Sequence, residues 1–236
     1  MNFETFEPVY EAILDDFGFD RAADERARDV AAEFATPFPL DRFGEWTGRT
    51  VAVAGAAPCL EAEVELARDA DVVVAASTAA DVLAAANVGV DCMVTDLDKN
   101  PETAWRLTTR EVPVVAHAHG DNVSAIREWL PQFEADWTLV TTQAAPRGPV
   151  RNVGGFTDGD RAAFLADHLG AGELLFPGWA FDDPNLERMK ARKLRWAARL
   201  LRWLERRREE QFAVLDGWRH RIDGGSTVAE GRWSTD

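Results

Sequence analysis

Short apolar runs alternate with amphipathic segments through the middle of the chain. The runs have the length of buried strands and are bounded by glycine, proline or polar residues, and the segments between them have helical periodicity. We predict strands at residues 50–54, 71–75, 90–95, 113–117, 137–142 and 173–176. Five helices are predicted between them. The first ends near Arg68, the second covers 78–86, the third starts at Pro101, and the last two cover 123–133 and 161–169. This alternation indicates an α/β fold with a doubly wound, mostly parallel, Rossmann-like sheet.

The two flanks of this core have different patterns. Apolar residues at helical spacing between Phe6 and Phe34 predict one or two amphipathic helices, which Pro37 and Pro39 terminate. A long helix rich in arginine, leucine and tryptophan is predicted over 184–212. We therefore divide the chain into an N-terminal helical cap (1–48), an α/β catalytic core (49–182), a C-terminal helix packed on the core (183–222) and a loose tail (223–236).

The net charge narrows the range of partners. The chain carries 41 acidic against 26 basic residues, a formal charge of −15, and its only lysines are Lys99, Lys190 and Lys193. An acidic surface poor in lysine is typical of proteins from concentrated salt, so we expect a halophilic source. No basic face large enough for general nucleic-acid binding is predicted.

Cysteine use and hydropathy indicate the compartment. Cys59 and Cys92 lie far apart in the sequence and read as reduced, buried thiols. No apolar run approaches the length of a membrane span, and the first residues are acidic, unlike a signal peptide. We expect a cytoplasmic protein with no membrane partner.

Two carboxylates follow the third predicted strand. Asp96 and Asp98 stand two positions apart after the run that begins at Val90, and side chains at this spacing on a strand share a face. Ligands of parallel α/β sheets bind at the carboxyl ends of strands, and paired carboxylates there are typical of a Mg²⁺ site. The alternative is a solvated turn in which Asp96 caps a helix.

A second polar stretch, His117-Ala-His119-Gly-Asp121-Asn122, follows the fourth predicted strand. If adjacent strands are neighbours, His119, Asp121 and Asn122 lie at the same edge as the aspartate pair. The His-x-His-x-Asp spacing also leaves open a zinc hydrolase. In a structural interpretation, His117 is a core residue and Asn122 caps a helix.

Phosphate-binding groups are predicted at three places, two loops and one helix. The stretch Gly154-Gly155-Phe156-Thr157-Asp158-Gly159-Asp160-Arg161 precedes a helix that Thr157 or Asp160 can cap, and an arginine beside a helix N-terminus suits a polyphosphate. The turn at Gly55 offers backbone amides after the first strand. Lys193, near the start of the long helix, can reach a phosphate. A plain glycine-rich surface loop remains the alternative for 154–161.

In combination, Thr95-Asp96-Leu97-Asp98, the 117–122 stretch and the stretch from Gly154 to Ala162 resemble the archaeal MptE-like family of 6-hydroxymethyl-7,8-dihydropterin diphosphokinases. The resemblance covers roughly residues 50–204. It implies a core similar to that of thiamine diphosphokinase and transfer of diphosphate from ATP to the pterin alcohol, with Mg²⁺ as cofactor and AMP as by-product. Three segments differ from the usual family pattern. Ala57 and Cys59 stand in the Gly-x-Gly-Pro-Ser loop, Ser77-Thr78 in Ala-Asp-Gly-Ala, and Trp179-Ala180 in Gly-Met-Asp-Phe.

The expected roles follow from the residues and the resemblance together. Asp96 and Asp98 are expected to hold Mg²⁺, with Asp121 as a further ligand, and Arg161 is expected to neutralise developing charge. The residues expected to bind ATP or its phosphates are Gly55, His119, Asn122, Gly154, Gly155, Thr157, Asp158, Asp160 and Lys193. Besides the zinc hydrolase, a non-catalytic nucleotide-binding relative stays open, as does a homo-oligomer.

Overall fold

Six parallel strands form the centre of the structure, a computed structural model that describes residues 1–184 and 186–224. Their order across the sheet is β5-β4-β3-β2-β1-β6. The strands are β1 (Thr50–Ala54), β2 (Val72–Ala76), β3 (Cys92–Thr95), β4 (Val114–Ala118), β5 (Thr138–Thr142) and β6 (Glu173–Leu175). Each predicted strand is present, and the predicted doubly wound α/β class is confirmed. Adjacent β3 and β4 pair, with Thr95 opposite Ala116.

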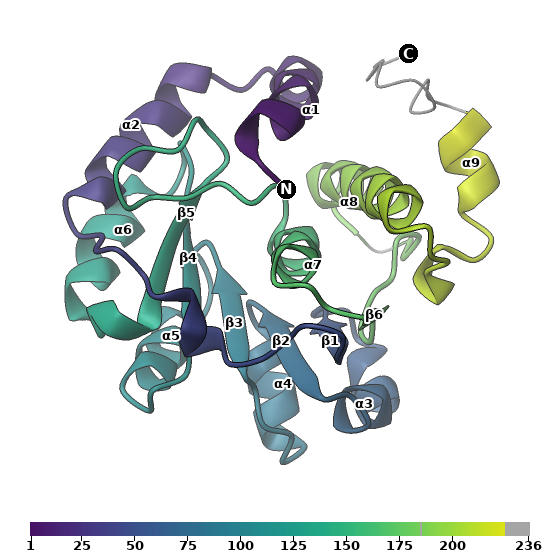
Figure 1. Cartoon of the computed structure of the whole chain (residues 1–236). Coiled ribbons are helices and arrows are strands. Elements are labelled where there is room, and N and C mark those ends of the chain that lie inside the picture. Colours follow the sequence, from purple (N-terminus) through teal and green to yellow (C-terminus); the bar gives the residue numbers. More distant parts are fainter. Residues whose placement is uncertain (185, 225–236) are drawn as a thin grey trace.

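The helices between strands cover both faces of the sheet (Figure 1). From β1 to β5 each new strand is added on the same side of the previous one. Right-handed crossovers therefore place the connecting helices on one face of the sheet. These are α3 (Leu60–Arg68), α4 (Ala79–Ala85), α5 (Pro101–Thr108) and α6 (Val123–Trp129), the last followed by two short 3-10 turns, η2 (Leu130–Gln132) and η3 (Ala135–Trp137). The return from β5 to β6 carries α7 (Asp158–His168) across the other face, over β1, β2 and β3. The switch in direction lies between β1 and β6.

The two N-terminal helices pack on opposite faces. Asn2 caps α1 (Phe3–Phe17), and Gly18, with φ of 69°, ends it in a left-handed conformation before α2 (Arg21–Ala32). Phe6 and Ile13 of α1 are buried in the same cluster as α7, whereas Ala27 and Ala31 of α2 belong to the opposite cluster. A 3-10 turn, η1 (Leu40–Phe43), leads into β1. The predicted helical segment is thus two helices, and the fourfold division of the chain stays a prediction.

The long C-terminal helix is shorter than predicted. It is α8 (Arg188–Arg208), because Glu209 adopts a left-handed conformation with φ of 55°. A 3-10 turn, η4 (Ala213–Leu215), and α9 (Arg219–Gly224) follow. The first two residues of the predicted loose tail therefore end α9, and the rest of that tail lies outside the described residues.

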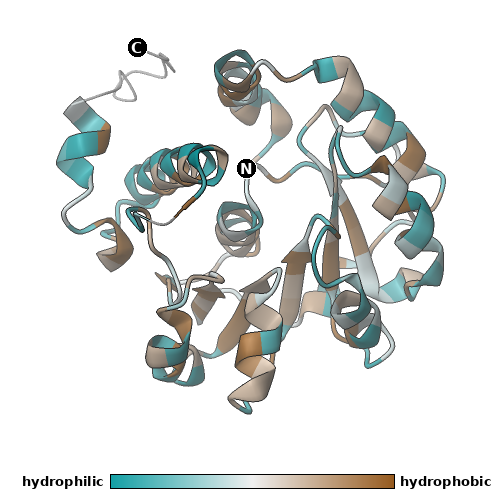
Figure 2. Ribbon diagram, turned by 180° about the vertical axis from the view of Figure 1, so that it is seen from behind, coloured by the Kyte–Doolittle hydropathy of each residue, from teal (hydrophilic) through white to brown (hydrophobic). Residues whose placement is uncertain are grey.

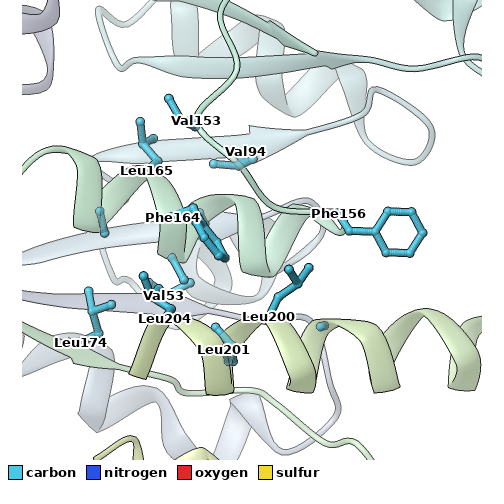
Figure 3. Packing of buried hydrophobic residues seen from close by; sticks show 14 of the residues in the cluster. Val53, Val94, Val153, Phe156, Phe164, Leu165, Leu174, Leu200, Leu201 and Leu204 are labelled. Atoms are coloured by element: carbon cyan, nitrogen blue, oxygen red, sulfur yellow. The ribbon is translucent and has the colours of Figure 1, made fainter. Parts of the chain in front are cut away.

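The strands bury side chains on both faces, as the near-continuous apolar runs indicate. Val51 and Val53 of β1 face the cluster formed with α1, α7 and α8, while Ala52 and Ala54 face α3 and α4. Figure 3 shows Phe164 of α7 with leucines of α8 in the first cluster. Figure 2 shows the apolar strands enclosed by helices that carry hydrophilic residues on their outer sides. No helix within 1–184 and 186–224 has both the length and the apolar character that crossing a membrane requires.

Candidate active site

Two adjoining cavities of about 350 Å³ each lie at the carboxyl edge of the sheet. Residues of the first cavity include Phe19, Asp24, Asp96, Asp98, His119, Asp121, Gln143, Phe156, Arg161 and Lys193. The second cavity is formed mainly by Gly55, Ala56, Ala57, Pro58, Ala76, Ser77, Gly178, Trp179 and Ala180. Both contact Lys99, Thr157, Asp158, Lys190 and Leu194, which we call the shared wall. The two cavities therefore adjoin along these five residues.

The aspartate pair lies in a turn just after β3. Leu97 has a φ of 66°, and its amide donates to Thr95 Oγ1 at 3.0 Å. The amide of Asp98 lies 3.3 Å from Asp96 Oδ1. The two carboxylates meet in the first cavity as predicted, but this turn brings them together, not the two-residue periodicity of a strand.

The electrostatics of the pair indicate a site for a cation. Burial opposes ionisation of Asp96, but hydrogen bonds with His119 and Asp98 and the charge of Arg161 hold its pKa well below the usual range. Burial and the proximity of Asp96 raise the pKa of Asp98 to about 6. Two carboxylates forced together in this way suit Mg²⁺, which needs only one or two protein carboxylates when phosphates and water complete its shell.

The charge balance of the first cavity supports the same fit. Seven carboxylates line it, from Asp20 to Glu187, against four cationic side chains, those of Lys99, Arg161, Lys190 and Lys193. The cavity is therefore net negative, and a divalent cation held by its carboxylates would offset the repulsion of a polyanionic ligand.

The stretch after β4 separates into residues that face the cavity and residues that support it. His119 Nε2 lies 3.6 Å from Asp96 Oδ2, and Asp121 lines the first cavity. Asn122 is buried: its amide group donates to the carbonyl oxygens of Asp96 and His117, at 2.7 Å each, and its Oδ1 accepts from the His119 amide. Asn122 thus ties the end of β4 to the aspartate turn and does not line either cavity.

His117 points into the protein. Its Nδ1 is 3.0 Å from Thr141 Oγ1, and burial, together with Arg161, keeps its pKa well below the usual value. In the described part of the chain, no group of three or more His, Cys, Asp or Glu side chains is arranged to hold a metal ion. A zinc-hydrolase centre with three protein ligands therefore has no support from these residues.

The glycine-rich stretch forms a helix N-terminus at the shared wall. The helix α7 begins at Asp158, three residues earlier than predicted. The buried Asp160 carboxylate accepts from the Thr157 hydroxyl at 2.7 Å and from the amides of Phe156 and Thr157, so Thr157 and Asp160 form the cap. The predicted cap is confirmed, and it ties the Asp160 carboxylate to the backbone.

The two glycines of this stretch lie behind the cavities. Gly154 and Gly155 have φ values of 92° and 93°. A Cβ at Gly155 would lie 2.6 Å from Arg161 Cα, and one at Gly154 would meet Phe164. These glycines allow the loop to pass close against α7, and they place Phe156 and Thr157 at the cavity.

Arg161 and Asp158 form a buried pair joined by a hydrogen bond. Arg161 Nη1 donates to Asp158 Oδ1 at 3.1 Å and Nη2 donates to Gln143 Oε1 at 3.2 Å. Its Nε is buried without a hydrogen-bond partner among the described residues. Burial and the nearby Asp96 raise the pKa of Asp158, although Arg161 opposes them. The guanidinium is held in place by its neighbours and retains donor capacity that these contacts do not use.

The structure adds Asp24, a residue that the sequence pattern does not single out. Its carboxylate accepts from the Tyr10 hydroxyl, the Gly120 amide and Gln143 Nε2, at 2.8 Å each. Asp24 thus links α1, α2 and the ends of β4 and β5, and it lines the first cavity. Its position three residues before Ala27, on the buried stripe of α2, is the signal that distinguishes it from a surface aspartate.

The turn after β1 differs from the prediction in its hydrogen bonding. The amide of Gly55 donates to Pro177 and that of Ala57 to Gly178, both at 2.9 Å. These two amides are therefore not free to bind a phosphate. Gly55 lines the second cavity, and its lack of a Cβ admits the Gly178 carbonyl oxygen and the Trp179 ring.

The second cavity gathers the three segments that differ from the usual family pattern. Ala57, Ser77 and Ala180 all line it, although they are far apart in the sequence. Ser77 has a φ of 49°, and its hydroxyl is buried with no hydrogen-bond partner among residues 1–184 and 186–224. The differences are thus concentrated in one cavity, and the first cavity keeps its predicted residues.

The fold and site define a doubly wound α/β protein with two adjoining, charged cavities at the carboxyl edge of its sheet. Comparison with known proteins specifies the family. Residues 29–185 match the family described as 6-hydroxymethylpterin diphosphokinase MptE-like, and the chain belongs to this family.

Three curated relatives carry the name 6-hydroxymethyl-7,8-dihydropterin pyrophosphokinase. The protein from Methanothermobacter thermautotrophicus is 37% identical over 216 residues, which cover 84% of this chain and 92% of the relative. The protein from Pyrococcus furiosus is 34% identical, covering 87% and 95% of the two chains. The protein from Methanocaldococcus jannaschii is 28% identical, covering 90% and 99%. The similarity thus extends over nearly the whole length of each relative.

Proposed function

We propose that the protein transfers a diphosphate group from ATP to the hydroxymethyl oxygen of 6-hydroxymethyl-7,8-dihydropterin. The observation that carries the proposal is that Asp96 and Asp98 line one cavity together with Arg161 and Lys193, within a chain of the MptE-like family. Carboxylates for a cation and basic groups for phosphates are the two requirements of such a transfer.

The reaction is a displacement at the β-phosphorus of ATP. The substrate hydroxyl oxygen forms a bond to this phosphorus and loses its proton, while the bond to the oxygen bridging the α- and β-phosphates breaks. AMP leaves with that oxygen, and the pterin diphosphate is the other product. Positioning of the two substrates and neutralisation of charge account for most of the catalysis expected here.

Asp96 and Asp98 would hold Mg²⁺ in the first cavity. Asp121, the predicted further ligand, lines this cavity but does not form a three-carboxylate cluster with them among the described residues. When bound, the ion would neutralise the phosphate oxygens and orient the polyphosphate. Asp96 stays ionised because His119 and Arg161 face it, so it provides a permanent anionic ligand. His119, beside Asp96, would orient the nucleotide or the acceptor.

Arg161, Thr157, Asp158 and Lys193 would bind the phosphates. Arg161 is held by Asp158 and Gln143 at the start of α7, so it needs little reorganisation to stabilise negative charge. Asp158 has a raised pKa and can present a carboxylic acid OH to a phosphate oxygen.

The other predicted binding residues would act through the positions of their neighbours. Asn122 would keep the aspartate turn in place, Asp160 would fix the cap of α7, and Gly154 and Gly155 would allow the close approach of the loop. Gly55 would shape the second cavity.

The test of this proposal is the double variant Asp96→Asn with Asp98→Asn. We expect it to abolish Mg²⁺-dependent formation of pterin diphosphate while leaving the circular dichroism spectrum unchanged, because each substitution keeps the shape of the side chain and removes its charge. The matched control is Asp69→Asn with Asp136→Asn, two exposed aspartates that precede β2 and β5 and so lie at the opposite edge of the sheet. Full activity in the first double variant would refute the assignment.

A protein that only binds nucleotides remains the second candidate, and the substitutions gathered in the second cavity favour it. It predicts that ATP binds without release of AMP when the pterin alcohol is present. The same product assay on the unsubstituted protein distinguishes the two functions.

A further inference from the structure

All three lysines of the chain lie at the two cavities. Lys193 lines the first cavity, and Lys99 and Lys190 belong to the shared wall. The other 23 basic residues, 26 less three, are arginines, and of those within 1–184 and 186–224 only Arg161 lines either cavity. Lysine is thus confined to the site, in a chain that uses arginine elsewhere.

The arginines and the lysines make different contacts. Among the described residues, every ion pair within 4 Å uses an arginine or His119, and none uses a lysine. The contrast is clearest within one turn of α8. Arg192 donates to Asp16 of α1, whereas Lys190 and Lys193, three residues apart on the same side of the helix, face the first cavity.

The position of the lysines suits a ligand that spans both cavities. Burial and the charge of Asp96 raise the pKa values of Asp98 and Asp158. The charge of Lys99 lowers both pKa values, so this lysine acts on both carboxyl groups. Lys193 Nζ lies 6.0 Å from the centre of the Phe156 ring, at the loop that precedes α7. The three ammonium groups therefore come from two elements, the turn after β3 and the start of α8.

Lysine and arginine bind phosphate differently. An ammonium group is a compact charge on a flexible stem, with three donors that can follow a phosphate as it moves, whereas the guanidinium fork requires one fixed geometry. Lysines outside the ion pairs, beside a fixed Arg161, suit a phosphoryl group that changes position during a transfer.

We propose that Lys99, Lys190 and Lys193 form a polyphosphate clamp, in which Lys99 and Lys190 bind the diphosphate group as it passes from the nucleotide to the acceptor. This clamp rests on the proposed function for its place in a reaction. Its binding role follows from the shared wall alone, because these two lysines contact both cavities.

The test measures equilibrium binding of ATP, inorganic tripolyphosphate and AMP, in Mg²⁺ at fixed ionic strength, to Lys99→Gln and Lys190→Gln. We expect each substitution to weaken the binding of ATP and of tripolyphosphate about tenfold, which is the effect of losing one charge-assisted hydrogen bond. Binding of AMP should change less than about twofold, because AMP lacks the β- and γ-phosphates.

Two further variants separate charge from packing. Lys190→Arg keeps the charge and should bind ATP within a few-fold of the unsubstituted protein. Arg195→Gln removes a charge from an exposed position on α8 that lines neither cavity, and it should leave all three affinities unchanged. The lysines line open cavities, so folding is expected to survive each change.

The outcomes distinguish the clamp from the proposed function. Unchanged ATP affinity in the lysine variants, equal losses for ATP and AMP, or an unsubstituted protein that binds neither ATP nor tripolyphosphate would overturn the clamp. If the lysine variants lose polyphosphate binding but the unsubstituted protein releases no AMP with the pterin alcohol, the clamp stands and the proposed reaction fails. If the reaction proceeds and the variants bind normally, only the clamp fails.

Discussion

The backbone at Gly155 fixes the position of Arg161. Its φ of 93° is rare for residues with a side chain, and a Cβ there would lie 2.6–2.8 Å from Arg161 atoms, two of them backbone. We predict that Gly155→Ala lowers the free energy of unfolding by about 2 kcal/mol or more, from backbone strain and overpacking. Urea unfolding monitored by circular dichroism measures this loss.

Gly89→Ala is the matched control for that prediction. Gly89 lies in the turn before β3, where an added Cβ would meet no atom within 4 Å beyond its chain neighbours, and its φ is not in the left-handed region. This substitution should change stability by less than about 0.5 kcal/mol. Equal effects of the two substitutions would show that the loop relaxes around Gly155.

Some site residues are readable from the sequence because they interrupt a pattern. Asp96 and Asp98 end an apolar run, so their place at the edge of the sheet is predictable. Asp24 lies in an amphipathic helix where charged residues are expected, and its burial depends on Tyr10, Gly120 and Gln143, which only the folded chain brings together. The spacing of Asp24 from Ala27 places it on the buried stripe of α2, but its three partners in distant segments leave no local signal.

At the scale of elements, Glu205 holds the C-terminal segment onto α8. Its side chain is fully buried and accepts from the Phe212 amide and from Arg219, each at 2.6 Å, and from Arg202. Burial opposes ionisation, but these hydrogen bonds keep the pKa of Glu205 below its usual value. Hydrogen bonds from Arg202 likewise lower the pKa of Asp223 in α9.

The pH dependence of this docking follows from the lowered pKa values. A carboxyl group with a lower pKa in the folded state contributes stability above its unfolded pKa and loses it as the pH falls through the folded pKa. We predict that amide hydrogen-exchange protection of residues 212–222, corrected for the intrinsic rate, is constant near neutral pH and decreases below about pH 4.

Substitution of Glu205 provides the control for this element. Glu205→Gln should reduce that protection by roughly 2 kcal/mol at neutral pH, because it removes the buried charge that Arg202 and Arg219 share and leaves each only its second carboxylate partner. Glu209→Gln, at an exposed position one turn further on, should have little effect. Unchanged protection in Glu205→Gln would show that apolar contacts alone hold α9.

The elements differ in how closely the sequence predicts them, for physical reasons. Strands are short apolar runs between turn residues, so their positions follow closely from the sequence. The sequence places the start of α7 too late because Asp158-Gly159-Asp160 has the composition of a loop, and its helical state depends on the cap at Thr157. It also places the end of α8 too late, because the arginine-rich pattern continues to Glu209, where the backbone turns left-handed.

The charge of the whole molecule has its own consequence. A net charge of −15 causes mutual repulsion in the folded state, which dissolved salt screens. We predict that the melting temperature at pH 7 rises as KCl increases from about 0.1 M to 2 M, with much of the early rise from screening. Near the sequence pI of about 4.7 the increase should be much smaller, and a melting temperature that falls with salt at pH 7 would contradict this expectation.

The central claim concerns the whole molecule with both substrates bound. The measurement that tests it most directly is the yield of AMP and of pterin diphosphate from ATP and Mg²⁺, with and without 6-hydroxymethyl-7,8-dihydropterin. Diphosphate transfer predicts that AMP forms only when the pterin alcohol is present, in an amount equal to that of the pterin diphosphate. A folded protein that binds ATP but forms no AMP, or that forms AMP equally well without the alcohol, would contradict the claim.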